Sequence, residues 1–96
     1  MKLFRSIQVE ITDGAYKGIQ RAPHHIAEKL QTWIKVVKLK GLERVRQIPG
    51  YHDEPLKGSR MGQRSIRLNR SYRAIYEVFY DEAIIIRIEE VTKHDY

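Results

Sequence analysis

A run of basic residues without any acid is the sequence feature that most limits how this chain can fold. Between the glutamates at positions 54 and 77 the sequence carries six cations: Lys57, Arg60, Arg64, Arg67, Arg70 and Arg73. Guanidinium groups at this density repel one another, so they must be solvated, paired with distant acids or matched to a polyanion. The planar fork of arginine suits phosphate in particular. The run therefore predicts a surface that binds phosphate groups.

The cations of this run lie three or four residues apart, which is also the spacing of one face of a helix. Gly58 and Gly62 oppose a helix, because each glycine inside one costs about 1 kcal/mol. A turn signal at 69–71 and an aromatic and β-branched sequence after it also oppose a helix. We therefore expect two strands, at 63–68 and 72–79. This hairpin would bring together the two cations that flank its turn, Arg67 and Arg73.

The segments before the hairpin are predicted to form a strand and helices. Residues 3–11 alternate from Ile7 onward and indicate a strand. A short helix is expected at 13–20, a long one from Pro23 to Gly41, and a third piece at about 42–47. Apolar residues at helical spacing predict the buried face of the long helix: Ile26, Leu30, Trp33, Ile34 and Val37.

The remaining segments complete a predicted α+β fold. Residues 51–62 are expected to be a loop, because they contain proline and glycine. Residues 83–91 indicate a well-covered strand, since Ile84–Ile86 is apolar on both sides. We expect one domain, residues 1–96, with the N-terminal strand and the helices packed on one face of an antiparallel sheet. The arginines are expected on the other face.

Composition narrows the class of protein and its partners. The net charge of +6 favours nucleic acid or an acidic protein as a partner. The absence of cysteine fits a reducing cytoplasm, and no apolar run approaches the length of a membrane span or a signal peptide. The sequence has no spaced histidine pair of the kind that binds metal. We therefore expect a cytoplasmic protein without a membrane segment, a metal site or another cofactor.

The residues around the basic run could together cut RNA. Cleavage without a metal occurs when the RNA 2′-hydroxyl is deprotonated and attacks the adjacent phosphate, which requires a base, phosphate-binding cations and an acid. Glu54 or His52 could be the base, and His94 or Tyr96 could be the acid. Three cations are assigned to the scissile phosphate: Lys57, Arg67 and Arg73. Four others are assigned to RNA contacts at the rim: Arg60, Arg64, Arg70 and Lys93.

The same residues also have an interpretation without catalysis. Glu54 could simply pair with Lys57. Arg73 could pair across the sheet with Glu77 or Glu89, and the residues near the C-terminus could lack a role. The residue pattern by itself leaves both interpretations open.

Three stretches carry short motifs: Ile48–Gly58, which ends in Pro-Leu-Lys-Gly; Arg67–Glu77, which contains Tyr-Arg-x-x-Tyr; and Val91–Tyr96, which ends in His-x-Tyr. Together they resemble the RelE/ParE superfamily of type II toxin–antitoxin systems. The resemblance is greatest to the RelE/StbE- and HigB-like mRNA interferase branch. It covers essentially the whole chain, including the order of helices before sheet.

This resemblance implies a ribosome-dependent endoribonuclease that cuts mRNA in the ribosomal A site. It also implies neutralisation by a cognate antitoxin protein in a hetero-oligomer. The resemblance assigns the general base to Glu54, which stands immediately before Pro-Leu-Lys-Gly as in YoeB-type relatives, and the phosphate contacts to Arg73 and Arg67. His94 and Tyr96 correspond to the terminal His and Tyr of the family, although one residue separates them here.

Two other functions stay open. ParE-type members share the fold but inhibit DNA gyrase and cut no RNA, and fold does not fix function. A basic RNA-binding module without catalysis would carry the same charge, although the sequence lacks the paired aromatics of an RRM-type platform. The presence of Glu54, Arg73 and His94 favours the nuclease.

Overall fold

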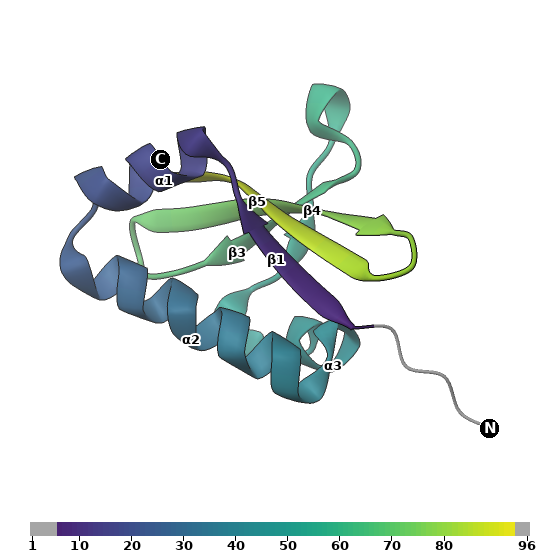
Figure 1. Cartoon of the computed structure of the whole chain (residues 1–96). Helices are drawn as coiled ribbons and strands as arrows, with labels where there is room; N and C mark the ends of the chain where they lie inside the picture. The colour runs from purple at the N-terminus through teal and green to yellow at the C-terminus, as the bar shows by residue number, and fades with distance from the viewer. Residues whose placement is uncertain (1–5, 94–96) are drawn as a thin grey trace.

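A five-stranded mixed sheet is the frame of the protein in the computed structural model, which describes residues 6–93. Its strands are β1 (Ile7–Ile11), β2 (Glu54–Pro55), β3 (Gln63–Arg67), β4 (Tyr72–Tyr80) and β5 (Ile84–Lys93). They lie in the order β1-β5-β4-β3-β2 (Figure 1). Strands β2 to β5 pair antiparallel, as expected for the C-terminal part of the chain. Strand β1 pairs in parallel with β5, so the whole sheet is mixed rather than antiparallel.

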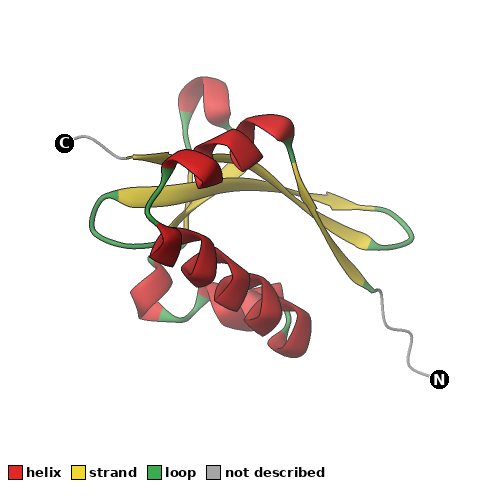
Figure 2. Ribbon diagram, turned by 60° about the vertical axis from the view of Figure 1, so that its left-hand side comes forward, coloured by secondary structure: helices red, strands yellow, loops and turns green. Residues whose placement is uncertain are grey.

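Three helices pack against this sheet. They are α1 (Asp13–Arg21), α2 (His24–Lys40) and α3 (Leu42–Arg46). Figure 2 shows the long α2 lying along one side of the twisted sheet. Each of the three helices predicted from the sequence is confirmed, with small differences at the ends. None of the helices within residues 6–93 is long and apolar enough to cross a membrane.

Particular residues decide where the helices begin and end. Thr12 caps α1, because its Oγ1 accepts a hydrogen bond from the backbone N–H of Ala15 at 3.1 Å. Pro23 immediately precedes α2, where a backbone N–H would have no helical partner. Gly41 ends α2 with a φ of +86°, which glycine adopts without the steric cost that a side chain would bring.

The hydrophobic core lies between the helices and one face of the sheet. The fully buried Trp33 of α2 packs on Tyr76 of β4, with 5.1 Å between the ring centroids. Ile86 and Ile88 of β5 belong to the same cluster. The predicted apolar stripe of α2 is confirmed as its core face: Ile26, Leu30, Trp33 and Val37 are buried and Ile34 packs against them.

A β-bulge in β5 changes which of its side chains face the core. Glu89 is the extra residue, opposite the middle of β4. Ile88 is buried just before the bulge, and strict alternation would direct Glu90 to the same side. The extra residue reverses the alternation, so Val91 is buried instead, and Glu90 and Thr92 turn to the opposite face.

The segment between α3 and β3 carries more structure than the sequence predicts. Residues 51–62 were expected to form a loop throughout, but they contain strand β2 and the short 3₁₀ helix η2 (Gly58–Arg60). Another 3₁₀ turn, η1 (Pro49–Tyr51), precedes them. Figure 1 shows the η2 loop projecting from the sheet on the side away from α2. This projection forms one wall of the site described next.

Candidate active site

A cavity of about 360 Å³ opens on the face of the sheet away from the core. Strand alternation places its residues there, because Ala74 and Tyr76 of β4 face the core and the residues between and before them face outward. The lining combines two cations, a carboxylate, two hydroxyl residues and two apolar side chains: Glu54, Leu56, Arg60, Ser65, Arg73, Ile75 and Thr92. Three of the residues singled out in the sequence therefore share one cavity: Glu54, Arg60 and Arg73.

Arg73 is the buried cation of this cavity. Only 8% of the residue is exposed, and its Nη1 donates a hydrogen bond to Oγ of Ser65 at 3.1 Å. The same nitrogen lies 3.7 Å from Oε1 of Glu54. A buried charge is costly unless it is paired and hydrogen-bonded. Arg73 is therefore held as a fixed positive charge beside Glu54.

Glu54 enters the cavity from the edge of the sheet. It stands opposite Ser65 in the register of β2 and β3, which directs both side chains to the same face. Its Oε2 lies 3.6 Å from Nε2 of His52, and about half of each of these two side chains is exposed, 48% and 53% respectively. The Glu54 carboxylate thus lies between the buried Arg73 and the exposed His52, and it stays accessible from solvent.

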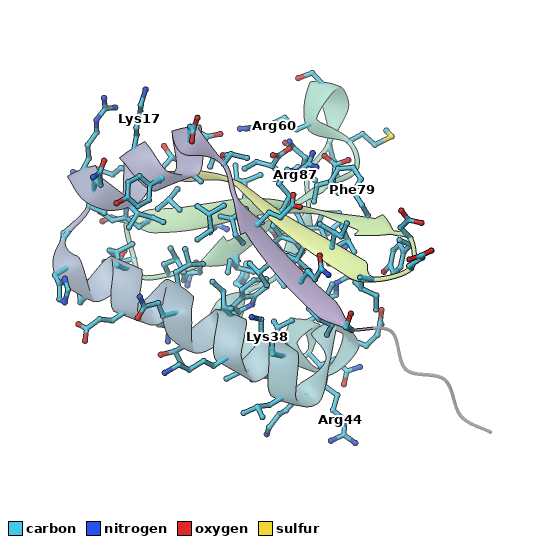
Figure 3. All side chains as sticks on the ribbon, viewed as in Figure 1. Lys17, Lys38, Arg44, Arg60, Phe79 and Arg87 are labelled. Atoms are coloured by element: carbon cyan, nitrogen blue, oxygen red, sulfur yellow. The ribbon has the colours of Figure 1, made fainter. Side chains whose placement is uncertain are left out.

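Arg60 reaches the cavity from the η2 loop. Its Nη2 contacts Oε1 of Glu90 at 2.5 Å, and its Nε donates a hydrogen bond to Oε1 of Gln63 at 3.0 Å. Figure 3 shows Arg60 above the sheet, on the opposite side from Lys38 of α2. Arg60, assigned from the sequence to RNA contacts at the rim, is one of the residues that line the cavity.

The other five predicted cations lie outside the cavity lining. Arg67 stands directly opposite Arg73 in the β3–β4 register, so the hairpin brings the two to one face as expected, but the Arg67 side chain is exposed. Lys57, Arg70 and Lys93 are exposed as well. These positions leave them available to a large anionic partner.

Arg64 lies on the other side of the sheet from these cations. It stands opposite Tyr76, which is buried in the core, and its Nε donates a hydrogen bond to Oδ1 of Asp53 at 2.6 Å. The prediction placed Arg64 among the RNA contacts of the arginine face. Its position does not support that role, because alternation along β3 turns it toward the helices.

Asp53 and Tyr76 form a buried polar contact beside Arg64. The Asp53 side chain is only 1% exposed, and its Oδ2 accepts a hydrogen bond from the Tyr76 hydroxyl at 2.5 Å. The Tyr76 hydroxyl also accepts a hydrogen bond from Nε of Arg46 at 3.5 Å. Burial, together with the hydrogen bond to Asp53, raises the pKa of Tyr76 well above its ordinary value. Tyr76 therefore stays protonated as a donor to Asp53.

Two of the predicted residues, His94 and Tyr96, lie outside the described residues.

Four lining residues were not identified from the sequence: Leu56, Ser65, Ile75 and Thr92. Alternation within the two predicted strands groups Ser65 with Arg67 and Ile75 with Arg73, and this is the sequence signal for both residues. Simple alternation along β5 does not place Thr92 in the lining, because the bulge at Glu89 reverses which side chains face the cavity. The step of three from Ile88 to Val91, after steps of two along β5, is the sequence signal that could have revealed it.

The arrangement offers a carboxylate, a fixed guanidinium and a second guanidinium around one open cavity. It can therefore accept a proton and stabilise negative charge at adjacent points. Within residues 6–93, no group of three or more His, Cys, Asp or Glu side chains could hold a metal ion. This donor set fits an anionic substrate better than a metal cofactor.

No family model matches the sequence, and no curated protein matches it. Several solved structures are similar. YafQ from E. coli strain BL21(DE3) has a TM-score of 0.71 at 19% identity, over 90% of this chain and 91% of that chain. A YoeB/ParE toxin from Agrobacterium tumefaciens has a TM-score of 0.68 at 22% identity, over 92% of this chain and 99% of that chain.

A third similar structure is a toxin–antitoxin complex, that of YoeB with YefM from Staphylococcus aureus. It has a TM-score of 0.65 at 24% identity, over 94% of this chain and 98% of that chain. At these identities the likeness is one of fold, and it extends over nearly the whole length of each protein. The chain therefore has the α+β fold shared by the YafQ and YoeB toxins of the RelE/ParE superfamily.

Proposed function

We propose that this chain is the toxin of a type II toxin–antitoxin system and a ribosome-dependent endoribonuclease that cuts mRNA in the A site. The observation that carries the proposal is the Glu54 carboxylate, 3.7 Å from the buried guanidinium of Arg73 in an open cavity. A base beside a fixed cation supplies the proton removal and charge stabilisation that RNA cleavage needs. The likeness of fold to the YafQ and YoeB toxins supports the assignment.

In the proposed reaction, Glu54 removes the proton from a ribose 2′-hydroxyl of the mRNA. The 2′-oxygen then forms a bond to the adjacent phosphorus, and the bond from phosphorus to the 5′-oxygen of the next nucleotide breaks. That oxygen takes a proton from a general acid. The products are a 2′,3′-cyclic phosphate and a 5′-hydroxyl end. No atom changes its oxidation state in this step, and the proton that leaves the 2′-hydroxyl is balanced by the one given to the 5′-oxygen, so side chains acting as base and acid can complete it.

Arg73 is assigned to the scissile phosphate, which gains negative charge as the 2′-oxygen attacks. Its guanidinium is already held by Ser65 and Glu54, so it needs little rearrangement when that charge develops. Arg67, exposed opposite Arg73, and Lys57, in the loop after Glu54, are proposed to add positive charge at the same phosphate.

His94 or Tyr96 is proposed as the general acid. A protonated imidazole and a phenol can each give a proton to a departing oxygen. Thr92 lines the cavity and precedes both residues closely in the sequence. Arg60, Arg70 and Lys93 are proposed as further RNA contacts, whereas Arg64 is left out because it pairs with Asp53 on the other face.

The proposed partners are a cognate antitoxin protein, the ribosome and mRNA, all met in the cytoplasm. The net charge of +6 favours an acidic antitoxin segment and ribosomal RNA. Similar folds were solved in complexes of a toxin with its antitoxin, DinJ–YafQ and YoeB–YefM, which supports a hetero-oligomer for this chain.

Expression of the chain without its antitoxin tests the proposal. Primer extension on translated mRNA should reveal new cleavage ends in cells that express the wild type. Arg73→Ala should reduce their rate of formation about 100- to 1,000-fold, the usual effect of losing one charge-stabilising group. Arg87→Ala is the matched control, because Arg87 is a partly exposed arginine of β5 that pairs with Glu10 outside the cavity.

Cleavage that persists undiminished in Arg73→Ala would remove Arg73 from the mechanism. Growth arrest without new mRNA ends would reject the nuclease altogether. Inhibition of DNA supercoiling by the purified wild type would then identify a gyrase-directed toxin, and salt-sensitive RNA binding without growth arrest would identify a simple RNA-binding module.

A further inference from the structure

A buried acid stands directly before the proposed general base. Asp53 precedes Glu54 in the sequence, yet its side chain is only 1% exposed, whereas that of Glu54 is 48% exposed. The two neighbours also face opposite sides of the sheet. Asp53 contacts Arg64 and Tyr76 on the core side, and Glu54 contacts Arg73 on the cavity side. Side chains of consecutive residues in extended backbone point in opposite directions, so fixing one constrains the other.

Both carboxylate oxygens of Asp53 are occupied. Oδ1 accepts from Nε of Arg64 at 2.6 Å, and Oδ2 accepts from the hydroxyl of Tyr76 at 2.5 Å. The donors come from β3 and β4, the two strands that also carry Ser65 and Arg73 of the cavity. We call these three residues, Asp53, Arg64 and Tyr76, the Asp53 clamp. It connects the segment of Glu54 to the strands that hold the phosphate-binding groups.

The segment of Glu54 needs such a connection, because its own backbone holds it only weakly. Strand β2 has two residues and lies at the edge of the sheet. Pro55 has no N–H to donate, so the next backbone bond is from Leu56 N to Gln63 O at 2.9 Å. On the other side, His52 is the one residue other than glycine with positive φ in residues 6–93, at 48°. A short edge strand between such neighbours could readily shift.

We propose that Asp53 is a positioning residue: the Asp53 clamp fixes the backbone of β2 so that the Glu54 carboxylate faces Arg73. The inference rests on the proposed function, since the role of Glu54 as a base is part of that proposal. A buried ionic contact is weak support for stability, because apolar replacements are often as stable. A role in placing Glu54 explains why a carboxylate occupies this site. A displacement of about 1 Å at a reacting group can cost about 100-fold in rate.

Asp53→Asn tests the inference, because it keeps the size of the side chain and removes its charge and one acceptor oxygen. Cleavage of mRNA on purified ribosomes by this variant should show a kcat about 10- to 100-fold lower. KM should stay near the wild-type value, since Arg73 and the exposed cations that bind RNA are unchanged. Tyr76→Phe, which removes one hydrogen bond of the clamp, should cause a smaller loss of kcat. Asp81→Asn, in the exposed β4–β5 turn, is the matched control.

Amide hydrogen exchange separates positioning from general destabilisation. In Asp53→Asn, exchange should become faster at residues 52–57 while the central residues of β4 keep their wild-type protection. An unchanged kcat, or a loss of protection spread equally over β4, would overturn the inference. If the wild type cuts no mRNA, the proposed function fails, but the exchange comparison still decides the clamp: equal protection of residues 52–57 in wild type and variant would overturn it.

Discussion

Two charged side chains are buried beside the sheet, one on each face. Arg73 is 8% exposed on one face, and the Asp53 side chain is 1% exposed on the other. Each is stabilised by specific partners, because a buried charge without them would cost several kcal/mol. Side chains that are already fixed by such partners lose little further conformational entropy when a substrate binds. We infer that both charges are fixed in the free protein rather than ordered by RNA.

Tyr76 makes the stability of the protein depend on pH in the alkaline range. Its pKa is raised in the folded state, chiefly by burial, so above pH ~10 the unfolded chain loses the phenolic proton while the folded chain keeps it. The free energy of unfolding should therefore fall as pH rises above about 10, by up to about 1.4 kcal/mol per pH unit from this group. Tyr76→Phe should make the fall shallower in chemical denaturation.

The control for this prediction is Tyr80→Phe, which removes a hydroxyl from a tyrosine that is 61% exposed. It should leave the alkaline slope as in the wild type. Equal slopes for wild type and Tyr76→Phe would show that the Tyr76 hydroxyl does not titrate differently in the two states.

At the scale of elements, the helices and the hairpin follow from the sequence, whereas the edge strand and the bulge do not. The period of apolar residues in α2 and the turn signal before β4 are local patterns, so the sequence alone predicts both. Strand β2 has only two residues, which is too short for a periodic pattern to be recognised in the sequence. It forms because its backbone pairs with that of β3. The bulge at Glu89 depends on pairing with β4. Two of the lining residues absent from the prediction follow from these features: Leu56 comes directly after β2, and Thr92 comes after the bulge.

The packing of α1 on β5 depends on a glycine. A Cβ at Gly18 would lie 2.1 Å from the backbone oxygen of Val91, a distance that no real Cβ contact reaches. Gly18→Ala should therefore destabilise the protein by about 1–3 kcal/mol in denaturant unfolding, despite the better helix propensity of alanine. The matched control in the same helix is Gly14→Ala, where the nearest atoms lie at 3.9 Å. It should be neutral or slightly stabilising. Equal stability of the two variants would contradict the close approach.

The η2 loop is tied to β5 by one ion pair, between Arg60 and Glu90. In the free protein Glu90 therefore competes with any phosphate for the Arg60 guanidinium. Glu90→Gln should release that cation and lower the KM for ribosome-bound mRNA by a fewfold, with kcat little changed. Glu82→Gln, in the exposed β4–β5 turn, removes the same charge elsewhere and should leave KM closer to the wild-type value. A higher KM in Glu90→Gln would show that the Arg60–Glu90 ion pair supports RNA binding and does not compete with it.

At the scale of the whole molecule, the sheet divides the protein into two parts with different tasks. The face toward the helices holds the core, and the other face holds the cavity with its cations. The net charge of +6 was readable from the sequence, as was the presence of an arginine face. Arg64 does not belong to that face, because alternation along β3 places it on the same side as the buried Ile66, whereas the register of β3 and β4 places Arg73 opposite Arg67.

The net positive charge predicts association that is steered by electrostatic attraction. Raising salt from about 50 to 200 mM should lower kcat/KM for mRNA cleavage on ribosomes steeply, because counterion release drives binding to RNA. The kcat at saturation should change little, since the Glu54–Arg73 contact forms inside a cavity where salt screens less. A kcat/KM that is independent of salt would exclude an electrostatic contribution to binding.

The proposed function is cleavage of RNA in the cavity of Glu54 and Arg73, by attack of the RNA's own 2′-hydroxyl on the adjacent phosphate. The most direct test uses purified ribosomes programmed with an mRNA that carries a single 2′-deoxynucleotide at the position of cleavage. We expect the all-ribose mRNA to be cut to a 2′,3′-cyclic phosphate and a 5′-hydroxyl end, and the 2′-deoxy mRNA to stay intact at that position. Equal cleavage of the two mRNAs would contradict the proposed function.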